Sequence, residues 1–319
     1  MPAPAIDRHP HGVYAIDTDY VRPRLDASHL VVRNGRAAFV DCGTNHSVPL
    51  LLDAPDALNV SRADVDYLFL THVHLDHAGG AGKLMAELPN ATCVVHPRGA
   101  PHLSEPAKLE AGTRATYGDA VYDTLYGELV PIPAERVRSI EDGETIELGG
   151  SRFTFLHTPG HALHHVAIHD ETAKAVFTGD IFGISYRVFD NPAGKPFVFV
   201  TTTPTQFDPG QMHASIDRVA ALTPEAVYLT HYSRVEDVQR FAGDLHRDVD
   251  DFVAIGEAHF DEPDAKERIR HALHDHLANR LAAHGTRLDP ETREIWLEMD
   301  VNLDAAGLVA WHARQMRHR

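Results

Sequence analysis

The chain has little cysteine and a deficit of positive charge. Cys42 and Cys93 are the two cysteines among 319 residues, and neither belongs to a CxxC pair. A disulfide framework is therefore excluded, and we expect both to be small buried residues in strands. The 29 Lys and Arg residues against 46 Asp and Glu residues give a net charge of −17. Because phosphate backbones and anionic lipid surfaces are bound by basic side chains, we expect neither nucleic acid nor a membrane as a partner.

Long hydrophobic runs are also missing. No stretch approaches the roughly 18 to 20 apolar residues that a membrane span needs. The beginning of the chain lacks the basic start and apolar run of a signal peptide. These features predict a cytoplasmic protein. Its hydrophobic content of 43% over 319 residues still allows a sizeable core.

Hydrophobic periodicity predicts alternating strands and helices over the first two thirds of the chain. The expected strands lie in 29–40, 65–71, 92–96, 139–156, 166–169, 174–177 and 226–229, and the expected helices in 78–88 and 210–222. The spans 29–40 and 139–156 are each predicted to contain a hairpin, around Asn34-Gly35 and around Gly149-Gly150. Two long connections interrupt this pattern. Segment 98–132 places Tyr117, Tyr122 and Tyr126 at near-helical spacing, and segment 182–207 is aromatic. Such connections form binding loops or lids in many domains, and an ordinary helix and an irregular surface loop are the alternatives.

The character of the chain changes after residue 233. Residues 234–284 are charged and helical in period, with a break near Pro263. We therefore predict a catalytic domain over 1–235 and a mainly helical extension over 236–319. Within the extension an apolar stripe has the spacing of one helix face and comprises Ile269, Leu273, Leu277 and Leu281. This stripe must pack on its own domain or, as an alternative, form a homodimer surface.

Histidine is abundant, with 24 residues, and one cluster stands out. His72 and His74 follow the strand over 65–71, and Asp76 and His77 lie on the turn into the next helix. Residues i and i+2 of an extended segment point to the same side, so His72 and His74 can present imidazoles to one point. Asp76 and His77 are then directed elsewhere. This division suits two metal ions, whereas the cluster 271–276 on a charged helix is better explained as solvated surface.

Three further motifs place possible ligands at strand ends. His161 closes the sequence HTPGH after one strand, Asp180 closes TGD after another, and His231 closes LTH after a third. Loops at strand ends are where binding residues gather in α/β folds. Imidazole and carboxylate groups together are ligands for zinc, and also for iron or manganese.

The order of these motifs resembles the metallo-β-lactamase fold superfamily over about residues 10–235. The sequences HVHLDHAGGAGKLMAELPNATCVVHPRG and YLTHYSRVED are similar to its small hydrolase branch, which includes glyoxalase II and lactonases. The resemblance implies an α/β (α+β) fold, a four-layered αβ/βα sandwich of two mixed β-sheets with a C-terminal helical extension. It also implies seven metal ligands, in which one ion is held by His72, His74 and His161, the second by Asp76, His77 and His231, and both by a bridging Asp180.

The function implied by the resemblance is hydrolysis assisted by two divalent metal ions, zinc first, with iron or manganese as alternatives. A hydroxide between the ions would attack a small ester, thioester or lactone. Asp76 would orient this hydroxide, and Asp180 would fix the separation of the ions. An iron-dependent oxidoreductase, similar to persulfide dioxygenases, is the alternative. A glutathione-binding set cannot be matched to the tail. Because the excess of acidic residues disfavours a polyanionic substrate, a small neutral or weakly charged substrate is the better expectation.

Residues beside the seven ligands are also candidates for a supporting role. We expect Asp41 to accept a hydrogen bond from a ligating histidine, as carboxylates around metal sites do. Thr71 and Thr230 precede ligands and are expected to be structural. His164 and His165 follow His161 closely, and we expect them to have ordinary strand or surface roles.

Overall fold

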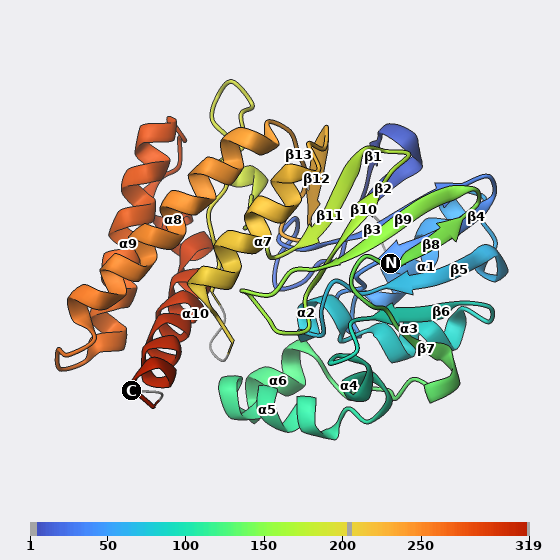
Figure 1. The fold of residues 1–319 in the computed structure, drawn as a ribbon, viewed down its shortest axis with the longest axis horizontal. Coiled ribbons are helices and arrows are strands. Elements are labelled where there is room, and N and C mark those ends of the chain that lie inside the picture. The colour runs from blue at the N-terminus through green and yellow to red at the C-terminus, as the bar shows by residue number, and fades with distance from the viewer. Residues whose placement is uncertain (1–4, 203–205, 318–319) are drawn as a thin grey trace. The chain divides into compact units, whose positions relative to one another are not determined.

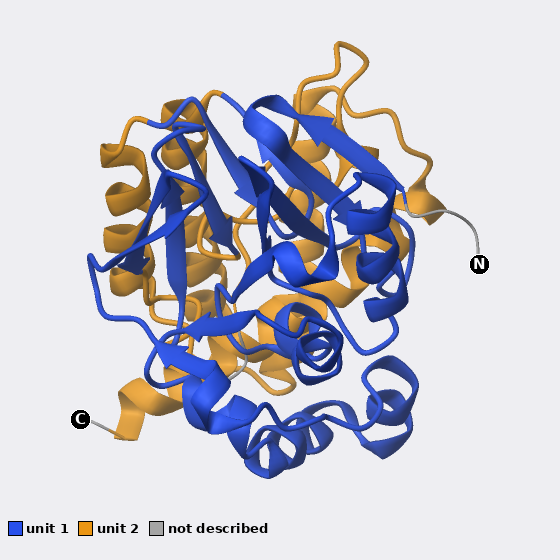
Figure 2. Ribbon diagram, turned by 90° about the vertical axis from the view of Figure 1, so that its right-hand side faces the viewer, with its two compact units in different colours: residues 1–157, 164–179, 224–236 blue, residues 158–163, 180–223, 237–319 orange. Residues whose placement is uncertain are grey.

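The computed structural model describes residues 5–202 and 206–317, which divide into two compact units (Figure 2). Unit 1 comprises the described residues up to 157 together with 164–179 and 224–236. Unit 2 comprises the described residues of 158–163, 180–223 and 237–319. Both β-sheets belong to unit 1 and the long C-terminal helices belong to unit 2. The predicted division of the chain at residue 235 stays a prediction.

The first sheet of unit 1 contains seven strands in chain order. They are β1 (Ile6–His9), β2 (Val13–Asp17), β3 (Ala27–Arg33), β4 (Arg36–Val40), β5 (Val65–Phe69), β6 (Thr92–Val95) and β7 (Val137–Ser139). Strands β1 to β4 pair antiparallel, and β4 to β7 pair parallel. The hairpin predicted around Asn34-Gly35 joins β3 to β4, as expected from this dipeptide.

The second sheet is also mixed. Its strands are β8 (Thr145–Leu148), β9 (Ser151–His157), β10 (Val166–Asp170), β11 (Ala175–Gly179), β12 (Ala226–Leu229) and β13 (Ser233–Val235), in the spatial order β13-β12-β11-β10-β9-β8. Strands β11 and β12 are parallel, and the other neighbours pair antiparallel. The hairpin predicted around Gly149-Gly150 connects β8 to β9.

The two sheets pack face to face through one apolar core. Phe69 of β5 contacts Phe153 and Phe155 of β9, with ring centroids 5.7 and 5.1 Å apart. The other face of the first sheet packs against α1 (Val48–Ala57) and α3 (Ala81–Glu87), where Leu51 and Leu84 are fully buried. Two mixed sheets with helices confirm the predicted α+β fold (Figure 1).

The remaining α-helices of unit 1 lie between β5 and β7 in the chain. They are α2 (Leu75–Ala78), α4 (Ala100–Ser104), α5 (Ala107–Tyr117) and α6 (Asp119–Leu125). The helix predicted over 78–88 begins later than expected, because Gly79 and Gly80 separate α2 from α3. Cys93 lies in β6 as predicted, whereas Cys42 is buried just after β4 and not in a strand.

Unit 2 contains four α-helices among the described residues, α7 (Pro209–Ala221), α8 (Val238–His259), α9 (Ala265–His284) and α10 (Pro290–Arg317). The predicted break near Pro263 separates α8 from α9. The four residues of the predicted apolar stripe are buried on α9, so the stripe packs within the chain. Among the described residues, no helix combines the length and the apolar character that crossing a membrane requires.

Candidate metal centre

The loop after β5 brings the first two histidines of the motif together. His72 Nε2 lies 2.8 Å from His74 Nδ1, and the ring centroids are 4.3 Å apart. His74 keeps an extended backbone, with φ −64° and ψ 150°, immediately before α2. The two imidazoles therefore face one point, as the i, i+2 spacing predicts. His72 is fully buried and His74 is half-buried.

A second group of donors lies beside the first. Asp76 Oδ2 is 3.8 Å from His77 Nε2 and 3.4 Å from His231 Nε2, and the three side chains offer ligand atoms within 4.8 Å of one another. Asp76 and His77 belong to α2, and His231 follows β12. The rings of His72 and His77 are 4.0 Å apart, so the two groups are neighbours within unit 1.

The carboxylate of Asp41 makes hydrogen bonds next to both donor groups. It accepts hydrogen bonds from the Thr71 backbone N–H at 2.8 Å, the Thr71 hydroxyl at 2.8 Å and the Thr230 hydroxyl at 2.9 Å. The fourth partner is His77 Nδ1, 2.8 Å from Asp41 Oδ2. This contact confirms that Asp41 accepts a hydrogen bond from a motif histidine. With the proton held on Nδ1, His77 directs the lone pair of Nε2 toward Asp76 and His231.

Unit 2 brings together the other two predicted ligands. His161 Nε2 lies 3.2 Å from Asp180 Oδ2, and both side chains are buried. The turn before His161 is held against α7, because Ser215 Oγ donates to the carbonyl of Pro159 at 2.5 Å. Gly160 adopts φ 132°, and a Cβ there would lie 2.4 Å from the backbone nitrogen of Met212. The Pro-Gly sequence thus permits a close approach that places His161.

Gly179 precedes Asp180 and has a packing role. It adopts φ 48°, and a Cβ at this position would lie 2.6 Å from Thr71 Oγ1 and 2.7 Å from His165 Nε2. Residues with a side chain are disfavoured by the positive φ and by these contacts. The glycine of the TGD motif is therefore required by its neighbours.

His164 and His165 lie beside the motif histidines, which the sequence interpretation missed. The ring of His165 is 5.0 Å from that of His72, and the ring of His164 is 5.6 Å from that of His74. Both are buried, so a surface role is wrong. Their position follows from a hydrogen bond of 2.7 Å from the Val166 N–H to the Thr71 carbonyl. Burial and neighbouring histidines lower the pKa of His164 to about 2, which keeps it neutral.

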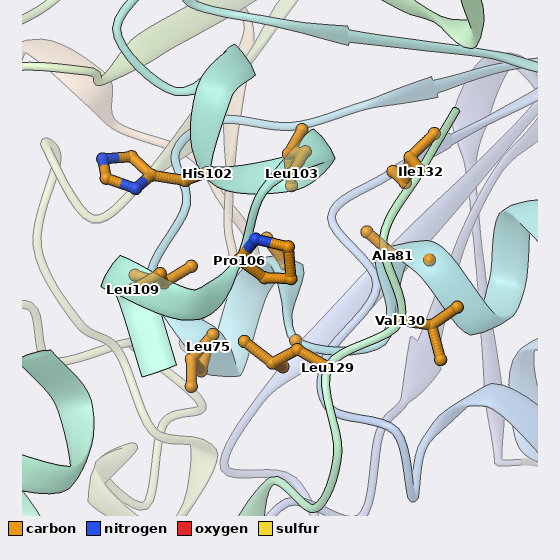
Figure 3. A pocket seen from close by; sticks show the side chains of 12 residues that line it. Leu75, Ala81, His102, Leu103, Pro106, Leu109, Leu129, Val130 and Ile132 are labelled. Carbon is orange, nitrogen blue, oxygen red and sulfur yellow. The ribbon is translucent and has the colours of Figure 1, made fainter. Parts of the chain in front are cut away.

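An apolar pocket adjoins α2 (Figure 3). Leu75 and Ala78 of α2 line it together with Leu103 and Leu109 of the segment between β6 and β7. The histidine among the lining residues is His102, on α4, and its ring centroid lies 6.5 Å from that of His164. The pocket shows that segment 98–132 packs closely over the helix that carries Asp76.

The sequence 271–276, predicted to be solvated surface, is only partly exposed, because His271 is exposed on α9 whereas His276 is half-buried. His9, near the start of the chain, shares a hydrogen bond of 3.1 Å with Ser233. A further group of possible donors comprises Asp248, Asp251 and His276, on α8 and α9. Arg280 pairs with Asp248 there, so an arginine already neutralises this carboxylate.

Known proteins are similar to this chain in sequence. The sequence model of the metallo-beta-lactamase superfamily matches residues 22–231. The metallo-beta-lactamase fold-containing protein ST1585 of Sulfurisphaera tokodaii is 30% identical over 226 residues, which cover 69% of this chain and 78% of that protein. A hydroxyacylglutathione hydrolase of Aeromonas hydrophila is 28% identical over 180 residues, covering 56% of this chain and 52%, about half, of that enzyme.

Solved structures give the same result for the fold. The crystal structure of ST1585 superposes with a TM-score of 0.66 at 20% identity, covering 93% of this chain and 98% of that one. The superfamily match spans most of the region that contains both sheets and five of the predicted ligands within unit 1. The chain therefore belongs to the metallo-beta-lactamase superfamily, which supports its assignment as a metallohydrolase.

Proposed function

We propose that the protein is a dinuclear metal-dependent hydrolase of small esters, thioesters or lactones. The observation that carries the proposal is the presence of two neighbouring donor groups in unit 1. One consists of His72 and His74, and the other consists of Asp76, His77 and His231. The pair of His161 and Asp180 in unit 2 supplies one further imidazole and one further carboxylate. The proposed ligand set is the one that the sequence resemblance implies, with Asp180 as the bridge.

The donors fit divalent metal ions by their chemistry. Neutral imidazole nitrogens and carboxylate oxygens are the ligands of zinc, iron and manganese, and we propose zinc as the first candidate. His72 and His74 direct two ring nitrogens to one point, and the hydrogen bond from His77 Nδ1 to Asp41 leaves Nε2 available. His231 Nδ1 is likewise engaged, at 3.1 Å from the Leu25 carbonyl, so Nε2 faces Asp76.

Bound metal ions supply an activated water and a Lewis acid that polarises the substrate carbonyl. The chain's own residues determine access and orientation. His72, His77 and His231 are buried, whereas His74 is half-buried and 24% of the Asp76 side chain is exposed. Substrate must therefore approach from the side of His74 and Asp76. The carboxylate of Asp76, partly in contact with solvent, is placed to orient a reacting water.

Metal analysis followed by a substrate panel tests the proposal. Protein purified without added metal is analysed for metal content and then assayed with an ester, a thioester and a lactone. We expect about two metal ions per chain and turnover of at least one substrate class. His72→Ala should lose metal and activity, and the matched control His271→Ala, on the exposed face of α9, should keep both. Full metal content without any hydrolysis would refute the function.

The iron-dependent oxidoreductase is not favoured by the comparisons. The same sample separates the two chemistries, because oxygen uptake with a thiol or persulfide is expected only for the oxidoreductase. We expect no oxygen uptake from the protein as purified, and iron-dependent uptake would favour the oxidoreductase.

A further inference from the structure

Two histidines on neighbouring helices of unit 2 face each other outside the proposed catalytic centre. Helices α7 and α8 pack against each other within this unit (Figure 1). His213 Nδ1, on α7, lies 2.7 Å from His246 Nδ1, on α8. The two rings are nearly parallel, with 15° between their planes and 5.0 Å between their centroids. Neither histidine belongs to the seven ligands that the sequence resemblance implies.

An aspartate follows each of these histidines by one helical turn. Asp217 lies four residues after His213 on α7, and Asp250 lies four residues after His246 on α8. The contacts cross between the helices, because Asp217 Oδ1 is 2.9 Å from His246 Nε2 and Asp250 Oδ1 is 3.2 Å from His213 Nε2. We call these four residues the interhelical cluster. Each helix supplies one imidazole and the carboxylate that contacts the imidazole of the other helix.

The packing of the two helices fixes the position of the interhelical cluster. Gln239 Nε2, on α8, donates a hydrogen bond of 2.7 Å to the carbonyl of Ala220, on α7. His213 lies seven residues before Ala220 and His246 lies seven residues after Gln239, so the antiparallel helices bring the histidines opposite each other. The side chains of His213 and His246 are 30% and 28% exposed, which leaves them half-buried and accessible to small ions.

The hydrogen-bonding groups of the cluster require a positive charge between the two Nδ1 atoms. An ionised carboxylate only accepts hydrogen bonds, so each Nε2 beside an aspartate carries a proton. A neutral imidazole that is protonated on Nε2 has its lone pair on Nδ1. The lone pairs of His213 and His246 would therefore repel each other at 2.7 Å unless a proton or a metal ion lies between them. A histidine whose other ring nitrogen contacts a carboxylate is the usual arrangement around protein-bound metal ions.

We propose that the interhelical cluster is a second metal site, in which a divalent ion of the zinc class binds between Nδ1 of His213 and Nδ1 of His246. Asp217 and Asp250 orient the two rings through Nε2. The two carboxylates give the cluster a charge of −2 when both imidazoles are neutral, which matches a divalent cation. Tetrahedral zinc, with bonds of about 2.1 Å to nitrogen, separates two ligand nitrogens by about 3.4 Å, so the rings must move apart by roughly 0.7 Å. The bound ion links α7 to α8.

Zinc titration tests the proposal. Equilibrium dialysis against increasing zinc measures the ions bound per chain for wild type, His213→Ala, His246→Ala and the control His271→Ala. The control removes an exposed imidazole of α9 that lies beside Arg270. We expect wild type and control to bind one zinc ion more per chain than either of the other two variants. Equal zinc binding by all four proteins would overturn the proposal and leave a shared proton between the two Nδ1 atoms.

Replacement of one carboxylate tests how the rings are oriented. Asp217→Asn keeps both imidazoles and changes the group that contacts His246 Nε2. We expect the affinity of the interhelical cluster for zinc to fall about 10- to 100-fold, as for other carboxylates that contact metal-bound histidines. An unchanged affinity would contradict the orienting role of Asp217.

Urea unfolding provides a readout that is independent of hydrolysis. Because the ion links two helices, added zinc should raise the unfolding midpoint of wild type more than that of His246→Ala. Magnesium prefers oxygen ligands and should give no difference between the two proteins. An equal shift of both midpoints by zinc would overturn the link between α7 and α8. Zinc bound at the proposed catalytic centre is common to both proteins, so the comparison does not depend on the proposed function.

Discussion

Replacing Asp41 by asparagine tests how far the donor group of α2 depends on the carboxylate beneath it. Asparagine has nearly the same size and tolerates the positive φ of 56° at this position. The change therefore alters hydrogen bonding and charge while it preserves the backbone. Its effect can be estimated from the four contacts of the carboxylate.

The carboxylate accepts four hydrogen bonds, from two groups of Thr71, from Thr230 and from His77, at 2.8 to 2.9 Å. An amide offers one oxygen and one NH₂, so in either orientation a donor faces donors. Loss of hydrogen bonds to a buried charged group should lower the free energy of unfolding of the metal-free protein by about 2 to 4 kcal/mol. Because His77 loses the partner that fixes its tautomer, metal affinity should fall about 10- to 100-fold.

Competition with a chromophoric chelator measures the metal affinity, and urea unfolding in the presence of chelator measures the stability. Asp170→Asn is the control, because Asp170 is also fully buried and accepts the N–H groups of Thr172 and Ala173, but it belongs to neither donor group. It should lose stability and keep metal affinity. An Asp41→Asn protein that binds metal as tightly as the wild type would refute the reasoning.

Three further predictions concern packing and pH. Gly179→Ala should lower the free energy of unfolding in urea by about 2 to 4 kcal/mol, because of the positive φ and the two close contacts. The control is Gly143→Ala, where φ is 77° and a Cβ would have no neighbour within 4 Å, so only the cost of the positive φ applies. Equal losses of stability in the two variants would contradict the steric argument. Burial lowers the pKa of His29 from 6.5 to about 3. Below pH 6.5 the imidazole of His29 is therefore protonated in the unfolded chain, but in the folded chain it stays neutral down to about pH 3. The free energy of unfolding falls as the pH is lowered through this range. When the pH is lowered from 7.5 to 5 in the presence of chelator, the free energy of unfolding of the wild type should fall by about 2 kcal/mol more than that of His29→Phe. Parallel dependence of the two proteins on pH would contradict this role of His29. Leu277→Ala on α9 should destabilise by about 2 to 5 kcal/mol in thermal or urea unfolding, whereas Ile295→Ala, 50% exposed, should change stability by less than about 0.5 kcal/mol.

Local sequence patterns were sufficient to predict much of the fold. Alternation and turn dipeptides located most strands and both hairpins, and the stripe containing Leu273 and Leu277 predicted the buried face of α9. The helix over 78–88 was predicted as one piece because the apolar spacing continues through it. Gly79 and Gly80 interrupt the helix, and periodicity counts them as neutral positions. The four-layered arrangement came from the resemblance, since pairing order depends on contacts between distant residues.

The donor geometry was predicted where it is local. The spacing of His72 and His74 was sufficient to predict two convergent imidazoles, and the position of Asp41 after a strand indicated its hydrogen bond to a motif histidine. His164 and His165 were missed because their place depends on the hydrogen bond between Val166 and Thr71, which are 95 residues apart in sequence. The dipeptide close after His161 was a signal, but it carries no information about the partner strand.

The glycine that precedes Asp180 has a consequence for protein engineering. A designer who transfers this centre to another scaffold would copy the histidines and aspartates, because these carry the chemistry. Gly179 has no side chain to donate, yet the space that it leaves is filled by Thr71 and His165. A transferred centre must therefore keep glycine at this position. A graft that copies only the donor side chains and places a larger residue here would push apart the segments that carry Thr71 and His165.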